Sequence, residues 1–200
     1  MRQKECLGYY YLHLRSFCAL ITMEVNMLGL DRDIVRLDGY DPSWKDEFEK
    51  EKLNVKKCLG DIALTIEHVG STSIEGLSAK PIIDMAVGVK DVETLKSTIK
   101  LLSDFGYDVQ DSIEEKDEVL ARKGAPENRT HYIHVMVVSG SRYIEQVLFR
   151  DYLRAHRDEV KRYEQLKKSS LEKFADNRKA YTASKNDYIR SVIEKAKLEK

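Results

Sequence analysis

The sequence predicts one domain of the α+β class, with β-strands in the middle of the chain and helices before, among and after them. Apolar and β-branched runs between residues 62 and 138 are typical of strands, whereas apolar residues elsewhere recur at helical spacing. No internal repeat or low-complexity linker divides the chain. A length of 200 residues suits one well-buried core and is short for two independent domains.

Composition limits the classes of function. Apolar residues make up 42% of the chain and charged residues 34%, as in an ordinary soluble globular protein. Lys plus Arg equals Asp plus Glu at 34 each, so no overall charge attracts nucleic acid or an anionic membrane, and neither is an expected partner. The three cysteines form no CxxC pair, which predicts reduced thiols and a cytoplasmic location.

The charges are unevenly distributed along the chain. Residues 104–118 contain seven acids and one lysine, and we expect an exposed hairpin or loop there. Residues 150–200 contain 15 Lys or Arg against 9 Asp or Glu. A basic helical region of this kind is either a solvated face or a wall that faces phosphate.

The first 26 residues are predicted to be an N-terminal extension, and the domain proper is expected to occupy residues 27–200. The apolar run from Cys6 to Met23 is interrupted by His13 and Arg15, so neither half approaches the roughly 18 to 20 residues that span a bilayer. Membrane insertion is not expected, and we predict that the domain folds without the extension.

A helix and a strand are predicted at the start of the domain. Pro42, followed by acids, opens a helix with an apolar side formed by Trp44, Phe48, Leu53 and Val55. Alternating and β-branched residues then predict a strand over residues 62–69, which Gly70 ends.

The later elements follow the same kinds of pattern. A nearly continuous apolar run over residues 81–89 predicts a strand covered on both faces, with Asp84 as its only charge. Helical periodicity extends from Asp91, an expected N-cap, to Gly106. Further strands are predicted at residues 107–110, 119–122 and 131–138, and the chain reads as helical from there to the C-terminus.

Gly70 and Ser71 lie at the entrance to a short turn or helix. Glycine lets the backbone approach a ligand closely, and amides at such a position can bind an anion, to which Ser71 and Ser73 would add hydroxyl donors. A tight turn capped by serine explains the same residues without a ligand.

Asp84 needs a partner, because an ionised carboxylate inside an apolar strand is costly when it stands alone. That partner is a metal ion, Lys80, an arginine from the helical tail, or a set of backbone donors.

Several motifs in order carry a family resemblance. The segments HVGSTS, KPIID, HYIHV, GS and FRDYLR, within about residues 30–193, resemble the GrpB-like family of the nucleotidyltransferase superfamily. Ser71 and Asp84, 13 positions apart, resemble the superfamily signature of Gly-Ser at one strand end and an acid on the next strand. The resemblance implies a nucleotidyltransferase-like mixed β-sheet with packed helices and a helical C-terminal portion.

The resemblance also implies a site for a nucleotide or another phosphate-bearing small molecule. Asp84 and His134 are the candidate catalytic residues and the candidate ligands of a divalent metal. The candidate phosphate-binding residues are Gly70, Ser71, Thr72, Ser73, Lys80, Arg150, Arg154, Lys167, Tyr181 and Lys185. We expect residues 70–73, Asp84, His134 and Arg150 to surround one concavity.

The carboxylate set that this resemblance calls for is incomplete. Active nucleotidyltransferases place two carboxylates two positions apart on one strand face, where they hold Mg²⁺, but the second position here is Ala86. His131 and His134 should face opposite sides of their strand, so only His134 is a candidate, either as a ligand or as a hydrogen-bonded core histidine. Asp84 with His134 would suit zinc, manganese or iron better than magnesium.

Arg150 and Arg154 lie one helical turn apart, a geometry that can grip a phosphate or a carboxylate. Arg150 could instead pair internally with Asp151, Asp158 or Asp84.

Three functional hypotheses remain open. The first is a nucleotide or phosphorylated-metabolite site, with nucleotidyl transfer as a further step. The second is a non-catalytic binding module in which Asp84, His134 and Arg150 form a hydrogen-bonded network. Relatives joined to dephospho-coenzyme A kinase imply a link with coenzyme A or nucleotide metabolism. The third, an RNA contact through the basic C-terminal helices, is opposed by the zero net charge.

Overall fold

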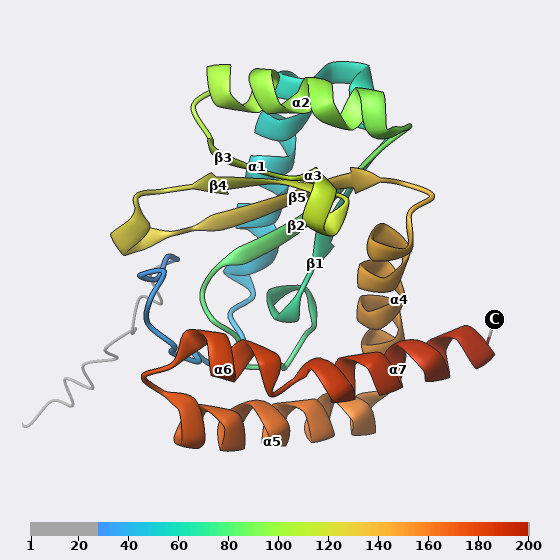
Figure 1. The fold of residues 1–200 in the computed structure, drawn as a ribbon. Coiled ribbons are helices and arrows are strands. Elements are labelled where there is room, and N and C mark those ends of the chain that lie inside the picture. The colour runs from blue at the N-terminus through green and yellow to red at the C-terminus, as the bar shows by residue number, and fades with distance from the viewer. Residues whose placement is uncertain (1–27, 200) are drawn as a thin grey trace, which may run out of the picture.

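The computed structural model describes residues 28–199 (Figure 1). The predicted extension over residues 1–26, with the boundary proposed at residue 27, therefore lies outside the described residues. Within residues 28–199, no helix combines the length and the apolar content that crossing a membrane requires. Cys58 is a free thiol.

Helix α1 (Ser43–Leu59) begins after Pro42, as the sequence predicts, and ends at Gly60, whose φ of 56° favours glycine. It buries Trp44, Phe48 and Val55 against the sheet. Leu53 does not belong to this apolar side, because its side chain is 72% exposed. Two residues before Val55, Leu53 is turned about 200° away around the helix, so it points to solvent.

The sheet has five strands in the order β1-β2-β5-β4-β3. The strands are β1 (Thr65–Val69), β2 (Ile83–Val89), β3 (Asp108–Ser112), β4 (Glu118–Lys123) and β5 (His131–Val137). Strands β2 and β5 pair in parallel and the other neighbours pair antiparallel, so the sheet is mixed. This confirms the predicted α+β class with a mixed sheet.

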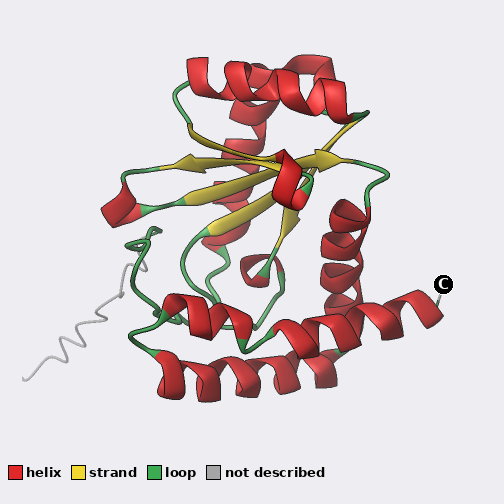
Figure 2. Cartoon of the chain, viewed as in Figure 1, coloured by secondary structure: helices red, strands yellow, loops and turns green. Residues whose placement is uncertain are grey.

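Helices cover both faces of the sheet (Figure 2). Helices α1 and α2 (Val92–Asp104) pack on one face, where Met85 and Val87 of β2 belong to the main core. Helix α4 (Ser141–Ala155) lies against the opposite face, where Ala86, Met136 and Tyr143 form a smaller cluster. The strand β2 is thus covered on both sides, as its apolar run predicts.

The helical C-terminal portion is a separate layer below the sheet in Figure 1. It consists of α5 (Arg157–Phe174), α6 (Arg178–Ala183) and α7 (Asn186–Leu198), and α5 and α7 share an apolar cluster with α4. The cluster includes Leu153, Tyr163 and Val192. The site described below lies between this layer and the sheet.

The acidic stretch over residues 104–118 is only partly the exposed segment that we predict. Its residues 113–116 form the short helix α3 (Ile113–Lys116), and Glu118 begins β4 with an exposed fraction of 2%. Glu118 is buried because its register places it beside Met136 of β5, inside the sheet.

Candidate functional site

The turn after β1 is held close to β2 by the absence of a side chain at Gly70. Gly70 has φ 70°, and a Cβ atom built on it would lie 2.4 Å from Oδ2 of Asp84. Both the backbone conformation and the space therefore require glycine. The turn brings the first predicted motif against the carboxylate of the second.

Residues 71–73 form a single 3-10 turn and not the start of a longer helix. The hydroxyl of Ser73 donates to the carbonyl of Gly70 at 2.7 Å, and the N–H groups of Ser73 and Ile74 donate to the carbonyls of Gly70 and Ser71. Ser73 is consequently committed within the turn. Ser71 lines the neighbouring cavity.

Asp84 and His134 come together on one face of the sheet. His134 is paired with Ala86 of the adjacent strand, and its Nε2 lies 3.8 Å from Oδ1 of Asp84. Nδ1 of His134 contacts Oε1 of Glu118, and Nη2 of Arg142 lies 2.8 Å from the other oxygen of Glu118 as an ion pair. The four groups form one chain of charges across three strands and the start of α4.

This chain of charges favours the imidazolium form of His134. Burial opposes the charge, but the carboxylates of Asp84 and Glu118 outweigh it and raise the pKa of His134 to about 9. Burial likewise opposes the charge of Glu118, and His134 and Arg142 more than compensate, so the pKa of Glu118 is lowered. At neutral pH this site therefore holds a protonated histidine between two carboxylates.

Glu118 and Arg142 are functional candidates that the sequence analysis does not include. Glu118 lies two residues before Leu120, so both side chains point to the same face of β4, and Leu120 is the register partner of His134. Extending the predicted strand of residues 119–122 by one residue at its start would place the Glu118 side chain on the face of His134. Nothing in the local sequence marks Arg142.

Ala86 lies on the same face as Asp84, as predicted, and is fully buried. It packs in the apolar cluster with Val69, Met136 and Tyr143. Where the second carboxylate is expected, the side chain of Ala86 therefore packs against apolar neighbours.

The donors present do not fit the two-carboxylate magnesium site that the superfamily resemblance implies. Asp84 supplies a single carboxylate, and the imidazole of His134 is protonated and engaged by Glu118. Over residues 28–199, no group of three or more His, Cys, Asp or Glu side chains is arranged to hold a metal ion. His131 does not add a ligand, because it faces the opposite side of β5, near Glu51.

A cavity of about 810 Å³ opens between this face of the sheet and the C-terminal helices. Hereafter it is the sheet-tail cavity. Candidate residues that line it are Gly70, Ser71, Thr72, Lys80, Asp84, His134, Lys167, Tyr181 and Lys185. Nine of the predicted site residues, far apart in sequence, thus meet at one cavity, whose volume is in the range of small-molecule sites.

Three lysines give the sheet-tail cavity its basic character. Burial lowers the pKa of Lys80 and of Lys185 to about 8. Nζ of Lys185 lies 4.3 Å from the ring centre of Tyr181, and Nζ of Lys80 lies 6.0 Å from the same ring. The ring of the buried Tyr181, which is 1% exposed, therefore lies within cation–π distance of two ammonium groups.

Lys167 is more deeply enclosed than the other two lysines. Its side chain is 1% exposed, its Nζ donates to the carbonyl of Ser78, and Glu164 lies 3.8 Å away. Burial lowers the pKa of Lys167 to about 7. Its hydrogen bond ties the middle of α5 to the segment between the turn and β2.

Arg150, Arg154 and Ser73 do not line the sheet-tail cavity, which corrects the predicted single concavity. They lie on the other side of the turn at residues 70–73, around a second cavity. Arg150 donates to Glu67 at 2.7 Å, to Asp151 at 2.7 Å and to a main-chain carbonyl. Its internal partners are thus Asp151, as anticipated, and Glu67, which the sequence analysis does not name.

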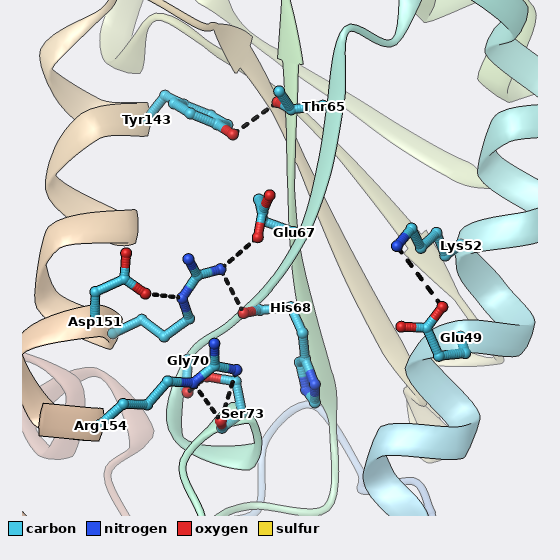
Figure 3. Close-up of polar contacts among 11 residues, drawn as sticks. Glu49, Lys52, Thr65, Glu67, His68, Gly70, Ser73, Tyr143, Asp151 and Arg154 are labelled. Atoms are coloured by element: carbon cyan, nitrogen blue, oxygen red, sulfur yellow. Dashed lines mark hydrogen bonds and ion pairs between the residues drawn. The ribbon is translucent and has the colours of Figure 1, made fainter.

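The reason for this division is the position of α4 along the edge strand β1. The side chain of Arg154 reaches the carbonyl of Ser73 from outside the turn, with Nε at 3.1 Å and Nη2 at 2.9 Å (Figure 3). Gly70 and Ser73 therefore separate the arginines from Asp84. Thr72 lines both cavities.

Residues 34–195 match the family model described as GrpB protein. The chain belongs to the GrpB family. It is 36% identical, over 84% of this chain and 98% of the relative, to the glutamate-rich protein GrpB of Alkalihalophilus pseudofirmus. It is 35% identical to the UPF0157 protein YqkA of Bacillus subtilis over 79% of this chain, which spans 46% of that relative.

A solved GrpB structure shares the fold. The crystal structure of the conserved protein GrpB from Enterococcus faecalis superposes with a TM-score of 0.73 at 31% identity, over 80% of this chain and 96% of that chain. A more distant similarity, 25% identity over 81% of this chain, is to a dephospho-CoA kinase of Mycolicibacterium paratuberculosis, of which it covers 46%.

Proposed function

We propose that the sheet-tail cavity binds a nucleotide or another phosphate-bearing small molecule. The single observation that carries the proposal is the pair of lysines, Lys80 and Lys185, whose ammonium groups both lie near the ring of Tyr181. Among the described residues, neither ammonium group has a carboxylate within ion-pair distance. An anion bound between them would supply the missing counter-charge.

The remaining walls suit the organic part of such a ligand. Tyr132, Phe149 and Tyr163 line the cavity together with Tyr181 and offer aromatic surface to a base or another flat group. His134 and Arg142 also line the cavity, and their charges are paired with those of Asp84 and Glu118. The cavity therefore combines a basic end with an apolar wall.

Binding without metal-assisted transfer is the form of this function that the residues favour. Asp84 is a lone carboxylate on its strand face, and the position two residues on is buried in an apolar cluster. Nucleotidyl transfer would require a second carboxylate to hold Mg²⁺ against a triphosphate. Within this proposal, Asp84 belongs to a network of charges with His134 and Glu118.

Coenzyme A precursors and nucleotides are the first ligands to test. Part of a curated dephospho-CoA kinase resembles this chain, which supports that choice and carries no mechanism.

The decisive experiment is calorimetric titration of ATP and of dephospho-coenzyme A, each with and without Mg²⁺. We expect Kd to be similar with and without Mg²⁺ and to rise steeply with salt. The variants Lys80→Gln and Lys185→Gln should each raise Kd at least tenfold. Lys161→Gln, an exposed lysine outside both cavities, is the matched control and should leave Kd unchanged.

Two results would contradict the proposal. One is equal affinity in wild type, Lys80→Gln and Lys185→Gln. The other is robust Mg²⁺-dependent nucleotidyl transfer that Asp84→Asn abolishes, which would make the protein an enzyme of the type that the carboxylate set disfavours.

A further inference from the structure

A second cavity of about 520 Å³ lies on the outer side of the turn at residues 70–73. Hereafter it is the outer cavity. Helix α1 forms one wall, and α4 with the start of α5 forms the other, while β1 and the turn close the inner side. Figure 3 shows this region, with Lys52 and Glu49 of α1 facing Glu67, His68 and Arg154 across it.

The outer cavity is rich in cations that differ in how they are paired. Lys52 lies 3.7 Å from Glu49, and Arg157 lies 4.0 Å from Glu75, both as exposed pairs. Arg154 and Lys45 also line the cavity, and in the part of the chain that the structure describes neither has a carboxylate within 4.0 Å. These two side chains carry the surplus positive charge.

The guanidinium groups are held in position before any ligand arrives. Arg154 uses Nε and Nη2 on the carbonyl of Ser73, which leaves Nη1 with no protein acceptor among the described residues. Arg150, 6% exposed, is fixed by Glu67, Asp151 and the carbonyl of His68. Preorganised donors of this kind lose little conformational entropy when an anion binds.

An apolar wall stands beside these cations. The ring of Phe48 stacks on the imidazole of His68, with centres 4.7 Å apart and planes 9° apart, and both residues are buried. Nε2 of His68 is hydrogen-bonded to the hydroxyl of Thr72 at 3.0 Å. Burial lowers the pKa of His68 to about 4, so the stacked ring is neutral and does not repel a cation or attract an anion by itself.

We infer that the outer cavity is a second binding site, for a small organic oxyanion that carries a flat apolar group. Arg154 and Lys45 contact the oxyanion, and the apolar group lies in the cavity beside Tyr40 and Phe48. A carboxylate and a phosphate ester share this chemistry. The inference is independent of the sheet-tail cavity, because no lysine of that cavity lines the outer one.

The test is titration of the isotope-labelled full chain, followed by two-dimensional NMR, with phenyl phosphate, benzoate and inorganic phosphate as separate probes. We expect saturable shifts at Phe48, His68 and Arg154 with at least one aromatic probe. Comparison of the Kd values of phenyl phosphate and benzoate shows whether the site prefers a phosphate ester or a carboxylate. Inorganic phosphate should bind at least tenfold more weakly than the better aromatic probe, because it lacks the flat group.

Two variants remove the proposed contacts in different ways. Arg154→Gln should raise the Kd of the aromatic probe at least tenfold, but it also removes hydrogen bonds to the turn. Lys45→Gln should raise Kd at least threefold, and the exposed side chain of Lys45 makes no hydrogen bond or ion pair within residues 28–199 that the substitution would disturb. Lys161→Gln controls for the change in net charge.

The outcome separates this inference from the proposed function. Lys185→Gln should weaken the binding of ATP to the sheet-tail cavity and leave the affinity of the outer cavity for the aromatic probe unchanged. Absence of saturable shifts around Phe48 up to about 10 mM probe would overturn the inference, as would unchanged affinity in both Lys45→Gln and Arg154→Gln.

Discussion

Single residues decide how closely β1, the turn and β2 approach one another. Gly70 is the clearest case, because any side chain at this position would meet the carboxylate of Asp84. The glycine of the Gly-Ser pair thus has a physical reason that needs no ligand, which is the packing of the turn against a charged residue.

We predict that Gly70→Ala lowers the free energy of unfolding by about 2 kcal/mol or more, since it combines a positive φ with a clash. Gly39→Ala is the control, because a Cβ atom at Gly39 meets nothing within 4 Å. Urea unfolding of both variants measures the difference. Equal stability of Gly70→Ala and wild type would mean that the turn moves freely away from Asp84.

His134 makes stability depend on pH. Its pKa rises from 6.5 to about 9 on folding, so its contribution is fully present below pH 6.5 and is lost as the pH rises through about 9. A shift of this size corresponds to about 3 kcal/mol at most. We predict that wild type loses more stability than His134→Gln between pH 6.5 and pH 9.

The comparison of the two proteins is needed because other groups titrate in the same range. Lys80 and Lys185 have lowered pKa values, and as their folded-state charge is disfavoured, they make the protein more stable as the pH rises above about 8. Subtracting the urea-unfolding profile of His134→Gln from that of wild type isolates the histidine. A flat difference would show that His134 is not charged in the folded protein.

At the scale of elements, the strand β2 shows what the sequence pattern can and cannot predict. Its apolar run predicts a strand buried on both faces, and parity places Ala86 beside Asp84, because both follow from the alternation of side chains. The neighbours of Ala86 come from β1, β5 and α4, and no local pattern predicts that they close over it.

The same distinction explains why one predicted concavity became two cavities. Helical spacing predicts that Arg150 and Arg154 share a face of α4, and they do line one cavity. Which side of the turn that face meets depends on how α4 crosses the sheet. Glu118 was missed for a related reason, since its burial arises from pairing with a strand that lies far along the chain.

We predict that Ala86→Asp destabilises the protein by about 3 kcal/mol or more and does not create Mg²⁺-dependent transfer. The new carboxylate would be fully buried among Val69, Met136 and Tyr143, and the neighbouring His134 is already paired with Glu118 and Asp84. Ala175→Asp, at an exposed position after α5, is the control. Thermal unfolding and a nucleotidyl-transfer assay check the two parts; Mg²⁺-dependent transfer by Ala86→Asp would contradict the second.

At the scale of the whole molecule, the sheet-tail cavity is built from parts distant in sequence that only the tertiary fold brings together. Lys80 precedes β2, whereas Lys185 lies just before α7, and both ammonium groups lie near the ring of Tyr181. A ligand can contact both lysines only when the C-terminal helices are packed on the sheet.

Ligand binding should accordingly take up protons near pH 8. An anion between Lys80 and Lys185 favours their charged forms, so their pKa values of about 8 should rise on binding. Calorimetric titration of ATP at pH 8 in two buffers of different ionisation enthalpy measures the uptake. We expect it to fall in Lys185→Gln, and an uptake of zero in wild type would place the phosphates away from the two lysines.

The turn at residues 70–73 lies between the sheet-tail cavity and the outer cavity, and Thr72 lines both. A ligand in one cavity that displaced Thr72 would also change the wall of the other cavity and the hydrogen bond between Thr72 and His68. Linkage is reciprocal: the factor by which an outer occupant changes the affinity of the inner one must equal the factor in the opposite direction. The four residues of the turn would then couple the two cavities.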